Sequence, residues 1–344
     1  MTRKPRPPVH HPDPVLVEAT RGPLVESLHR GAVAVCDAAG EILAGWGDIE
    51  RAVFPRSAVK PLQALPLIET GAAERFALSD QEIALACASH AGNALQVELV
   101  EKWLLRIGLT ETDLECGPQI PSDADTARAL LCADKAPSAL HNNCSGKHCG
   151  MLTTARHLNE PTKGYVGADH PVQLRITAVL GEMTGTVPQH TPFGTDGCGI
   201  PTYALPLSGL ATAMARLADP SRQGPTRRKA AARILAAMSA HPELIAGKGR
   251  LSTEVMRAVP SVMIKGGAEG VYTAILPGKG LGVAVKIDDG ANRAAEVALL
   301  AVLRHLQAFT TEEEAALADH LQPILRNAAG QAIGVLRPAP DWLG

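Results

Sequence analysis

The sequence predicts an α+β protein, with an antiparallel sheet flanked by helices and a helical subregion. Near the N-terminal end, apolar runs at 32–36 and 41–46 flank the glycine-containing turn 37–40, a pattern typical of a hairpin. Towards the C-terminal end, apolar runs alternate with glycine-rich turns, which predicts an antiparallel meander with strands at 262–265, 271–276 and 282–287. The alanine-rich segments between these two β regions favour helices inserted into one sheet-forming domain.

Local signals place individual helices. Ser79 and Glu82 form a capping box that predicts a short helix through Cys87. Asn93 predicts the start of a second helix, which Gly108 ends after about Ile107. Helical spacing predicts further helices at 204–218, 225–240 and 291–308, then one or two more from 310 and a strand at 332–336.

Composition and charge restrict the function classes. The chain has 344 residues, 46% hydrophobic and 20% charged, as in soluble globular proteins. A net charge of −2 argues against a nucleic-acid partner, and no apolar run is long enough to span a membrane. Seven cysteines do not resemble a secreted disulfide framework. We therefore expect a cytoplasmic protein.

The domain organisation follows from the same pattern. The proline-rich, basic segment 1–14 is expected to be a disordered tail. Residues 15–344 are expected to form a single domain with a helical insertion at roughly 60–250, because no linker divides them.

A Ser-x-x-Lys motif at 56–60 is the first candidate for catalysis. Residues three apart share a face of a helical turn, so the Lys60 amine could lie beside the Ser57 hydroxyl. There it would act as a base if its pKa were lowered. Pro61 and Pro66 predict that the turn is short or irregular. Because this motif is common on surface helices, its assignment depends on the rest of the chain.

A second serine and a second lysine stand in turns that a ligand could approach. Ser89 lies in a small-residue turn after a capped helix, where it either faces a pocket or merely ends the helix. Lys265 precedes Gly266 and Gly267 at the end of an apolar strand, which permits close approach of a ligand. A solvated lysine at a strand end is the alternative.

Two segments rich in glycine, cysteine and polar residues, 141–150 and 194–199, are expected to be loops. The histidine and cysteine spacings of the first fit no standard zinc pattern, and buried free thiols are an equal alternative. This first loop offers His141, Cys144, His148 and Cys149, and pairing it with Asp196 and Cys198 strengthens the case for a metal, since two thiolates with an oxygen and a nitrogen ligand suit zinc.

The order of these features is similar to that of serine β-lactamases and penicillin-binding proteins, in which Ser-x-x-Lys and Lys-Thr-Gly line one cleft. Here Gly266 replaces the threonine and no Ser-Asp-Asn occurs, which makes a β-lactam function doubtful. A closer resemblance runs from Val15 to about Gln307. Six motifs resemble the class 3 (rhizobial-type) L-asparaginases: VEATRGPLVESLHRG, RSAVKPLQALP, ACASHAGN, LHNNCSGKHCGML, TDGCGIPT and KGGAEGVYTAILPGKGLGVAVKIDDG.

The resemblance implies an amidohydrolase that converts L-asparagine to L-aspartate and ammonia, usually as a homodimer. It implies two Ser–Lys pairs, namely Ser57 with Lys60 and Ser89 with Lys265. It also implies a zinc site near the catalytic serines, formed by Cys144, Lys147, Asp196 and Cys198. A lysine that binds a metal must be neutral, because an ammonium has no lone pair.

Our mechanistic hypothesis makes Ser57 the nucleophile and Lys60 its base, with Ser89 and Lys265 relaying a proton to ammonia. The sequence does not distinguish which serine forms the acyl bond. Arg56, His90 and Asn93 flank the two serines and are expected to hold the α-carboxylate and amine of the substrate.

Three other functions stay open. A glutaminase or another small-amide hydrolase needs the same apparatus, because one methylene is worth only about 1–3 kcal/mol of discrimination. A non-catalytic relative that binds zinc or a ligand is the second, and a β-lactam-binding protein is the third.

Overall fold

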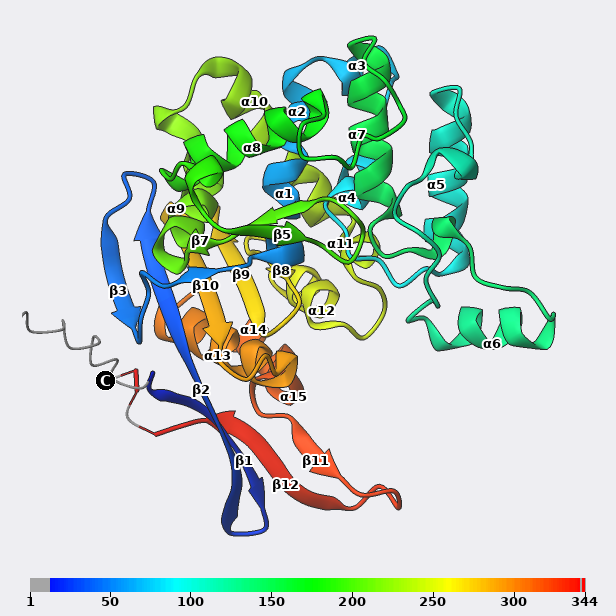
Figure 1. The fold of residues 1–344 in the computed structure, drawn as a ribbon. Coiled ribbons are helices and arrows are strands. Elements are labelled where there is room, and N and C mark those ends of the chain that lie inside the picture. Colours follow the sequence, from blue (N-terminus) through cyan, green and yellow to red (C-terminus); the bar gives the residue numbers. More distant parts are fainter. Residues whose placement is uncertain (1–12, 341, 344) are drawn as a thin grey trace, which may run out of the picture.

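The computed structural model describes residues 13–340, 342 and 343, and it confirms the α+β class with an antiparallel sheet flanked by helices (Figure 1). The main sheet has the order β11-β12-β1-β2-β10-β9-β8, and β3 also pairs with β2. Its strands are β1 (Val15–Arg21), β2 (Leu24–Asp37), β3 (Ile42–Trp46), β8 (Met263–Gly266), β9 (Val271–Leu276), β10 (Leu281–Ile287), β11 (Ile324–Arg326) and β12 (Ala332–Pro338).

The predicted hairpin and meander are confirmed. Strand β2 pairs with β3 through Val33 and Trp46, and β8, β9 and β10 pair in sequence order. Strand β2 is much longer than the predicted run, because its first half pairs with β1, a strand that was not predicted. That first half is largely exposed and mixes polar with apolar residues, so it shows no apolar run.

Both faces of the central sheet are buried. In β2, Ala32 and Ala34 face the cluster that includes the helical subregion, whereas Val33 and Val35 face the cluster that includes helix α13. Helix α9 (Leu207–Ala218) packs on the first face and α13 (Asn292–His305) on the second. This burial on both sides explains why the second half of β2 has a continuous apolar run.

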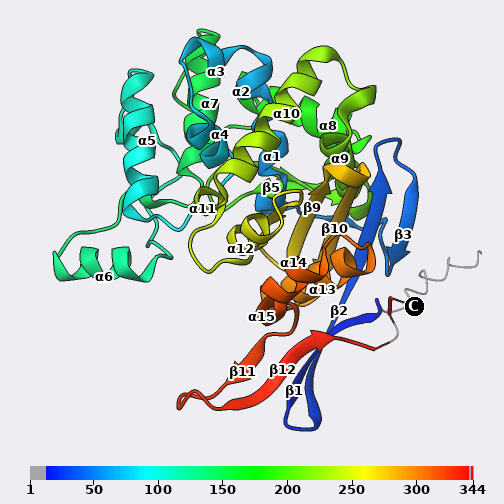
Figure 2. The ribbon, with the colours of Figure 1, turned by 180° about the vertical axis from the view of Figure 1, so that it is seen from behind.

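The helical subregion lies between β3 and β8 in sequence and covers one side of the sheet (Figure 2). Predicted helices are confirmed at α4 (Asp80–Ala86), α5 (Ala94–Arg106), α9, α10 (Pro225–Ala240) and α13, and in the tail at α14 (Thr311–Ala316) and α15 (Ala318–Leu321). The other helices are α1 (Lys60–Gln63), α2 (Leu65–Glu69), α3 (Ala72–Arg75), α6 (Ala124–Cys132), α7 (Ser145–His157), α8 (Pro171–Thr184), α11 (Pro242–Ile245) and α12 (Leu251–Ala258).

The expectation that 141–150 forms a loop is wrong, because α7 begins at Ser145. This helix is buried along nearly its whole length, so tertiary packing overrides the poor helix propensity of its glycines. A Cβ at Gly146 would lie 2.4 Å from the carbonyl oxygen of Leu85, so only glycine lets α4 pack this closely. The second expected loop, 194–199, partly overlaps β5 (Phe193–Thr195), which pairs with β6 (Pro201–Tyr203).

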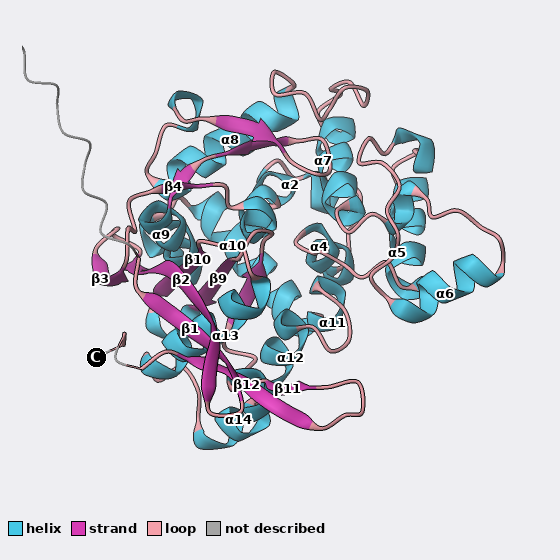
Figure 3. Cartoon of the chain, turned by 60° about the horizontal axis from the view of Figure 1, so that its bottom comes forward, coloured by secondary structure: helices cyan, strands magenta, loops and turns pink. Residues whose placement is uncertain are grey.

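Short strands β4 (Ala52–Val53) and β7 (Leu205–Pro206) pair beside the helical subregion. Seen from below, the strands of the main sheet gather on one side and α5 and α6 lie far from it (Figure 3). Among the described helices, none has the length and apolarity that crossing a membrane requires.

The expected disordered tail, 1–14, lies outside the described residues except for Asp13 and Pro14. Asp13 is buried and forms an ion pair of 2.8 Å with Arg51.

Candidate active site

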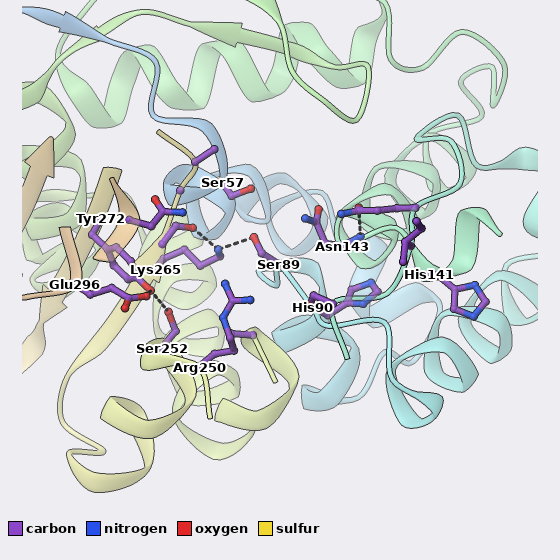
Figure 4. A pocket seen from close by; sticks show the side chains of 18 residues that line it. Ser57, Ser89, His90, His141, Asn143, Arg250, Ser252, Lys265, Tyr272 and Glu296 are labelled. Atoms are coloured by element: carbon purple, nitrogen blue, oxygen red, sulfur yellow. Dashed lines mark hydrogen bonds between the residues drawn. The ribbon is translucent and has the colours of Figure 1, made fainter. Parts of the chain in front are cut away.

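A cavity of about 230 Å³ lies where the end of β8, the turn after α4 and the segment before α12 meet (Figure 4). The predicted catalytic residues Ser57, Ser89 and Lys265 line it. Its other lining residues are mostly polar, and they are His90, Gln119, Ile120, Ser122, His141, Asn143, Ala246, Arg250, Ser252, Gly266, Gly267, Ala268, Tyr272, Asn292 and Glu296.

Ser57 stands in a short 3₁₀ turn, Arg56–Val59, that runs directly into α1. The short, irregular turn expected from the prolines is therefore present, although Lys60 itself has helical dihedrals. Ser57 also lines an adjoining cavity of about 260 Å³, and its hydroxyl hydrogen-bonds to no other described residue. Arg56 has φ +51°, a conformation that costs a non-glycine residue roughly 1–3 kcal/mol and is typical of functional sites.

Two buried lysines meet on the hydroxyl of Ser89. The Nζ of Lys60 lies 3.1 Å and the Nζ of Lys265 2.8 Å from Ser89 Oγ. Lys60 also donates to the carbonyl oxygens of Ala88 and Asn143, at 2.5 and 3.3 Å. The spacing led us to expect Lys60 beside Ser57, but its amine extends to Ser89 instead. The site is thus one connected Lys–Ser–Lys group rather than two separate pairs.

Burial lowers the pKa of Lys265 well below the usual lysine value, and the positive charge of Lys60 lowers it further. Burial also lowers the pKa of Lys60. Two ammonium groups around one hydroxyl repel each other, which disfavours protonation of both amines at once. This arrangement favours at least one neutral amine, which can act as a base.

Two backbone N–H groups beside Ser57 are available to an oxyanion. The N–H of Ser57 heads the 3₁₀ turn, where helix geometry provides no partner. Ala268 lines both cavities, and its N–H donates to no other described residue. A Cβ at Gly267 would lie 2.7 Å from the carbonyl oxygen of Pro55, so this glycine lets the end of β8 lie against the serine turn. Such paired donors can stabilise a tetrahedral oxyanion.

The glycine in place of the threonine of Lys-Thr-Gly has a steric cause. A Cβ at Gly266 would lie 2.7 Å from the ring of Tyr272, which fills the space that a larger residue would need. The Tyr272 hydroxyl hydrogen-bonds Ser252 and donates to Glu296, each at 3.4 Å.

The three predicted substrate-binding residues do not share one cavity. Arg56 is ion-paired with Asp196 at 2.5 Å and lines the adjoining cavity. His90 lines the main cavity, but both its ring nitrogens are occupied, because Nδ1 accepts from the N–H of Gly92 and Nε2 contacts Ser145. Asn93 caps α5 and is not among the lining residues of the described cavities.

His90 is electrically neutral in this environment. Burial and the charge of Lys60 lower its pKa to about 3. It therefore fixes the turn that carries Ser89 and has no charge to offer a substrate carboxylate.

The predicted metal ligands come together beside the adjoining cavity. The Nζ of Lys147 donates to Cys198 Sγ at 3.0 Å, and Cys198 Sγ lies 3.7 Å from Asp196 Oδ2. The pKa of Cys144 is held well below its usual value by a hydrogen bond with the Cys198 thiol, and Lys147 lowers it further. Burial alone would lower the pKa of Lys147, but the nearby Cys144 and Cys198 raise it.

The donor set is chemically suited to a soft cation, since it combines two sulfurs with an amine. Among the described residues, however, no three His, Cys, Asp or Glu side chains are arranged to hold a metal ion. A metal here would therefore need Lys147 as a ligand, and it would have to displace the proton of that amine.

Sequence reasoning missed the charged residues of the cavity, above all Arg250 and Glu296. Arg250 precedes α12 in a segment without a motif. Glu296 had a signal in the sequence, because it is the one charged residue in the otherwise apolar segment 294–303 of α13.

A family model described as L-asparaginase II matches residues 17–338. The chain belongs to the L-asparaginase II family. It is accordingly an amidohydrolase, and L-asparaginase activity is the activity of its family. The resemblance to L-asparaginases is confirmed at this level.

Solved structures give more distant likenesses. A β-lactamase from Mycobacterium bovis is 16% identical with a TM-score of 0.38, over 85% of this chain and 95% of that one. A class C β-lactamase from Rhodobacter sphaeroides is 16% identical with a TM-score of 0.41, over 80% and 95%. Mglu in its glutamate form is 13% identical with a TM-score of 0.47, over 82% and 62%.

Two of these three structures are β-lactamases, the class that the order of the sequence motifs resembles. Their TM-scores lie below 0.5, so the chemistry of the site is argued from this structure alone. No curated protein sequence matches the chain.

Proposed function

We propose that this L-asparaginase hydrolyses L-asparagine through an acyl-enzyme on Ser57. The observation that carries the proposal is the Lys60–Ser89–Lys265 group at the same cavity as an unpartnered Ser57 hydroxyl. A serine becomes a nucleophile only when a neighbouring base removes its proton, and buried amines with lowered pKa supply that base.

In acylation, Ser57 Oγ attacks the side-chain amide carbon, and its proton passes to a neutral amine of the Lys60–Ser89–Lys265 group. The oxyanion forms beside the N–H groups of Ser57 and Ala268. As the C–N bond breaks, the leaving nitrogen takes a proton from Ser89 Oγ, which is reprotonated by the lysines that contact it. Ammonia departs and an aspartyl ester remains on Ser57.

In deacylation, a water molecule attacks the ester carbonyl. The same Lys–Ser–Lys group removes its proton and returns one to Ser57 Oγ. The products are L-aspartate and the free enzyme, so protons and bonds balance over the cycle.

We further propose that Cys144, Lys147 and Cys198 hold zinc, with Asp196 beside them. The support is the contact of Lys147 Nζ with Cys198 Sγ and the position of Cys144, Asp196 and Cys198 around the adjoining cavity, which Ser57 also lines. When bound there, the metal would supply positive charge at the polar end of the substrate site. Metal content by plasma emission spectrometry, compared between wild type and Cys198→Ser, tests the assignment, and equal content in both would contradict it.

Two further proposals concern the oligomeric state and the compartment. We propose a homodimer, as the family resemblance implies, and sedimentation equilibrium tests it. We also propose a reducing, cytoplasmic compartment, because all seven cysteines are free thiols.

The test of the function is ammonia release from L-asparagine and, in parallel, from L-glutamine. We expect turnover of L-asparagine that falls by about 10⁴-fold or more in Ser57→Ala. Ser221→Ala, at an exposed serine, is the matched control and should behave as wild type. Release from L-glutamine alone would keep the mechanism and change the substrate, whereas normal turnover by Ser57→Ala would overturn the role of Ser57.

A further inference from the structure

Two opposite charges face the main cavity without pairing to each other. Arg250 makes no hydrogen bond or ion pair through its guanidinium with any other described residue, although it lines the cavity. Glu296 lines it too, and its only described partner is the hydroxyl of Tyr272, at a long 3.4 Å. No ion pair forms between these two side chains, so the two charges are held apart across the cavity.

The ionised carboxylate of Glu296 is destabilised by burial unless a cation lies beside it. It stands on α13 between fully buried neighbours, and burial raises its pKa, an effect that the charge of Arg250 opposes. A carboxylate in such surroundings is stabilised by a cationic partner. Because the described residues supply none in contact, the partner would come from the ligand.

The cavity between the charges leads to the reacting groups. Figure 4 shows Arg250 extending towards Ser89 and Lys265, with Glu296 beside Tyr272 and Ser252. A volume of about 230 Å³ suits a small polar molecule rather than a peptide. A small ligand placed here would meet a cation, an anion and the nucleophile within one cavity.

We propose that Arg250 and Glu296 recognise the α-carboxylate and α-ammonium groups of the amino-acid substrate, and so make this site specific for a free α-amino acid. This inference rests on the proposed function. Guanidinium matches a carboxylate through paired N–H donors, and a carboxylate accepts from an ammonium. It also replaces the expected roles of Arg56, His90 and Asn93, of which the first is paired, the second neutral and the third outside the cavity.

The proposal predicts selective losses that depend on the substrate group removed. Arg250→Met should raise KM for L-asparagine roughly 10- to 100-fold with a smaller change in kcat, because a charged hydrogen bond is lost. Glu296→Gln should do the same. Arg257→Met, an exposed arginine on α12, and Glu314→Gln on α14 are matched controls that should keep the wild-type KM.

Substrate analogues make the assignment specific. Succinamate lacks the α-amino group, and 3-aminopropanamide lacks the α-carboxylate. Wild type should turn over both analogues poorly. Glu296→Gln should lose only the preference for L-asparagine over succinamate. Arg250→Met should lose only the preference for L-asparagine over 3-aminopropanamide. Equal losses by each variant on all three substrates, or no loss, would overturn the proposal.

Binding of L-aspartate to Ser57→Ala, measured by calorimetry, separates recognition from catalysis. We expect binding that weakens roughly 10- to 100-fold when either charge is removed in the same background. Unchanged binding would overturn the recognition role even if catalysis is confirmed. Absence of L-asparagine turnover by the wild type would instead count against the proposed function.

Discussion

Lys265 carries the clearest pH prediction at the scale of single residues. Its amine is buried, contacts Ser89 Oγ, and has a pKa well below the usual value because of burial and Lys60. A base must be neutral to accept a proton, so kcat/KM should rise with pH through the lowered pKa and be lost as pH falls below it. A pH profile of kcat/KM for L-asparagine measures this.

The variant Lys265→Arg keeps a positive charge at every working pH, so it should lose about 10²- to 10⁴-fold in kcat across the profile. Lys229→Arg, at an exposed lysine, is the control and should reproduce the wild-type curve. An unchanged acidic limb in Lys265→Arg would show that another group acts as the base.

Sequence reasoning identified motif residues that the fold brings together, but it did not predict their contacts. Ser57, Ser89 and Lys265 all line one cavity, as the paired motifs led us to expect. That Lys60 reaches Ser89 rather than Ser57 could not be foreseen, because the choice depends on how the turn after α4 approaches in space. The charged residue Arg250 lies outside any motif, and only the fold brings it to the site.

Helix α7 gives a prediction at the scale of one element, because it contains two glycines in different surroundings. A Cβ at Gly146 would lie 2.4 Å from the Leu85 carbonyl oxygen, so Gly146→Ala should destabilise the protein by about 1–3 kcal/mol through overpacking. At Gly150 the nearest atom is 3.4 Å away, on Leu67. Gly150→Ala should therefore be neutral or stabilising by up to about 1 kcal/mol.

Chemical denaturation of the two variants measures this difference in the free energy of unfolding. If Gly150→Ala proved as damaging as Gly146→Ala, the close contact with α4 would not be the reason for the glycine.

Elements with strong local signals were predictable, and those fixed by packing were not. The capping box of α4 and the Asn93 cap of α5 are both formed as the sequence indicated. Helix α7 was mistaken for a loop because its small and polar residues disfavour a helix, and only burial on all sides stabilises it. Strand β1 was missed because its adjacent partner, the first half of β2, has no apolar run and its other partner, β12, lies at the opposite end of the chain.

For the whole molecule, the buried and neutral His90 links the free energy of unfolding to pH. The pKa of His90 is about 3 in the folded protein because of burial, against an ordinary value of 6.5. Between these values the unfolded chain binds the proton and the folded chain does not, so the free energy of unfolding falls as pH is lowered through this range. The slope from one such group is at most about 1.4 kcal/mol per pH unit.

Urea denaturation at several pH values between 3 and 7 measures this effect. His90→Gln retains a donor and an acceptor but cannot titrate, so its stability should fall less steeply with acid. A variant with the same slope as the wild type would show that His90 is not the group responsible.

The central claim is that Ser57 forms the acyl-enzyme. Rapid acid quench of the enzyme with L-asparagine, followed by peptide mass spectrometry, tests it most directly. Hydroxylamine added during turnover should divert the same intermediate to aspartyl hydroxamate. We predict an aspartyl ester on the peptide that contains Ser57, absent from Ser57→Ala. An ester on Ser89 instead, or full turnover without ester or hydroxamate, would contradict the account.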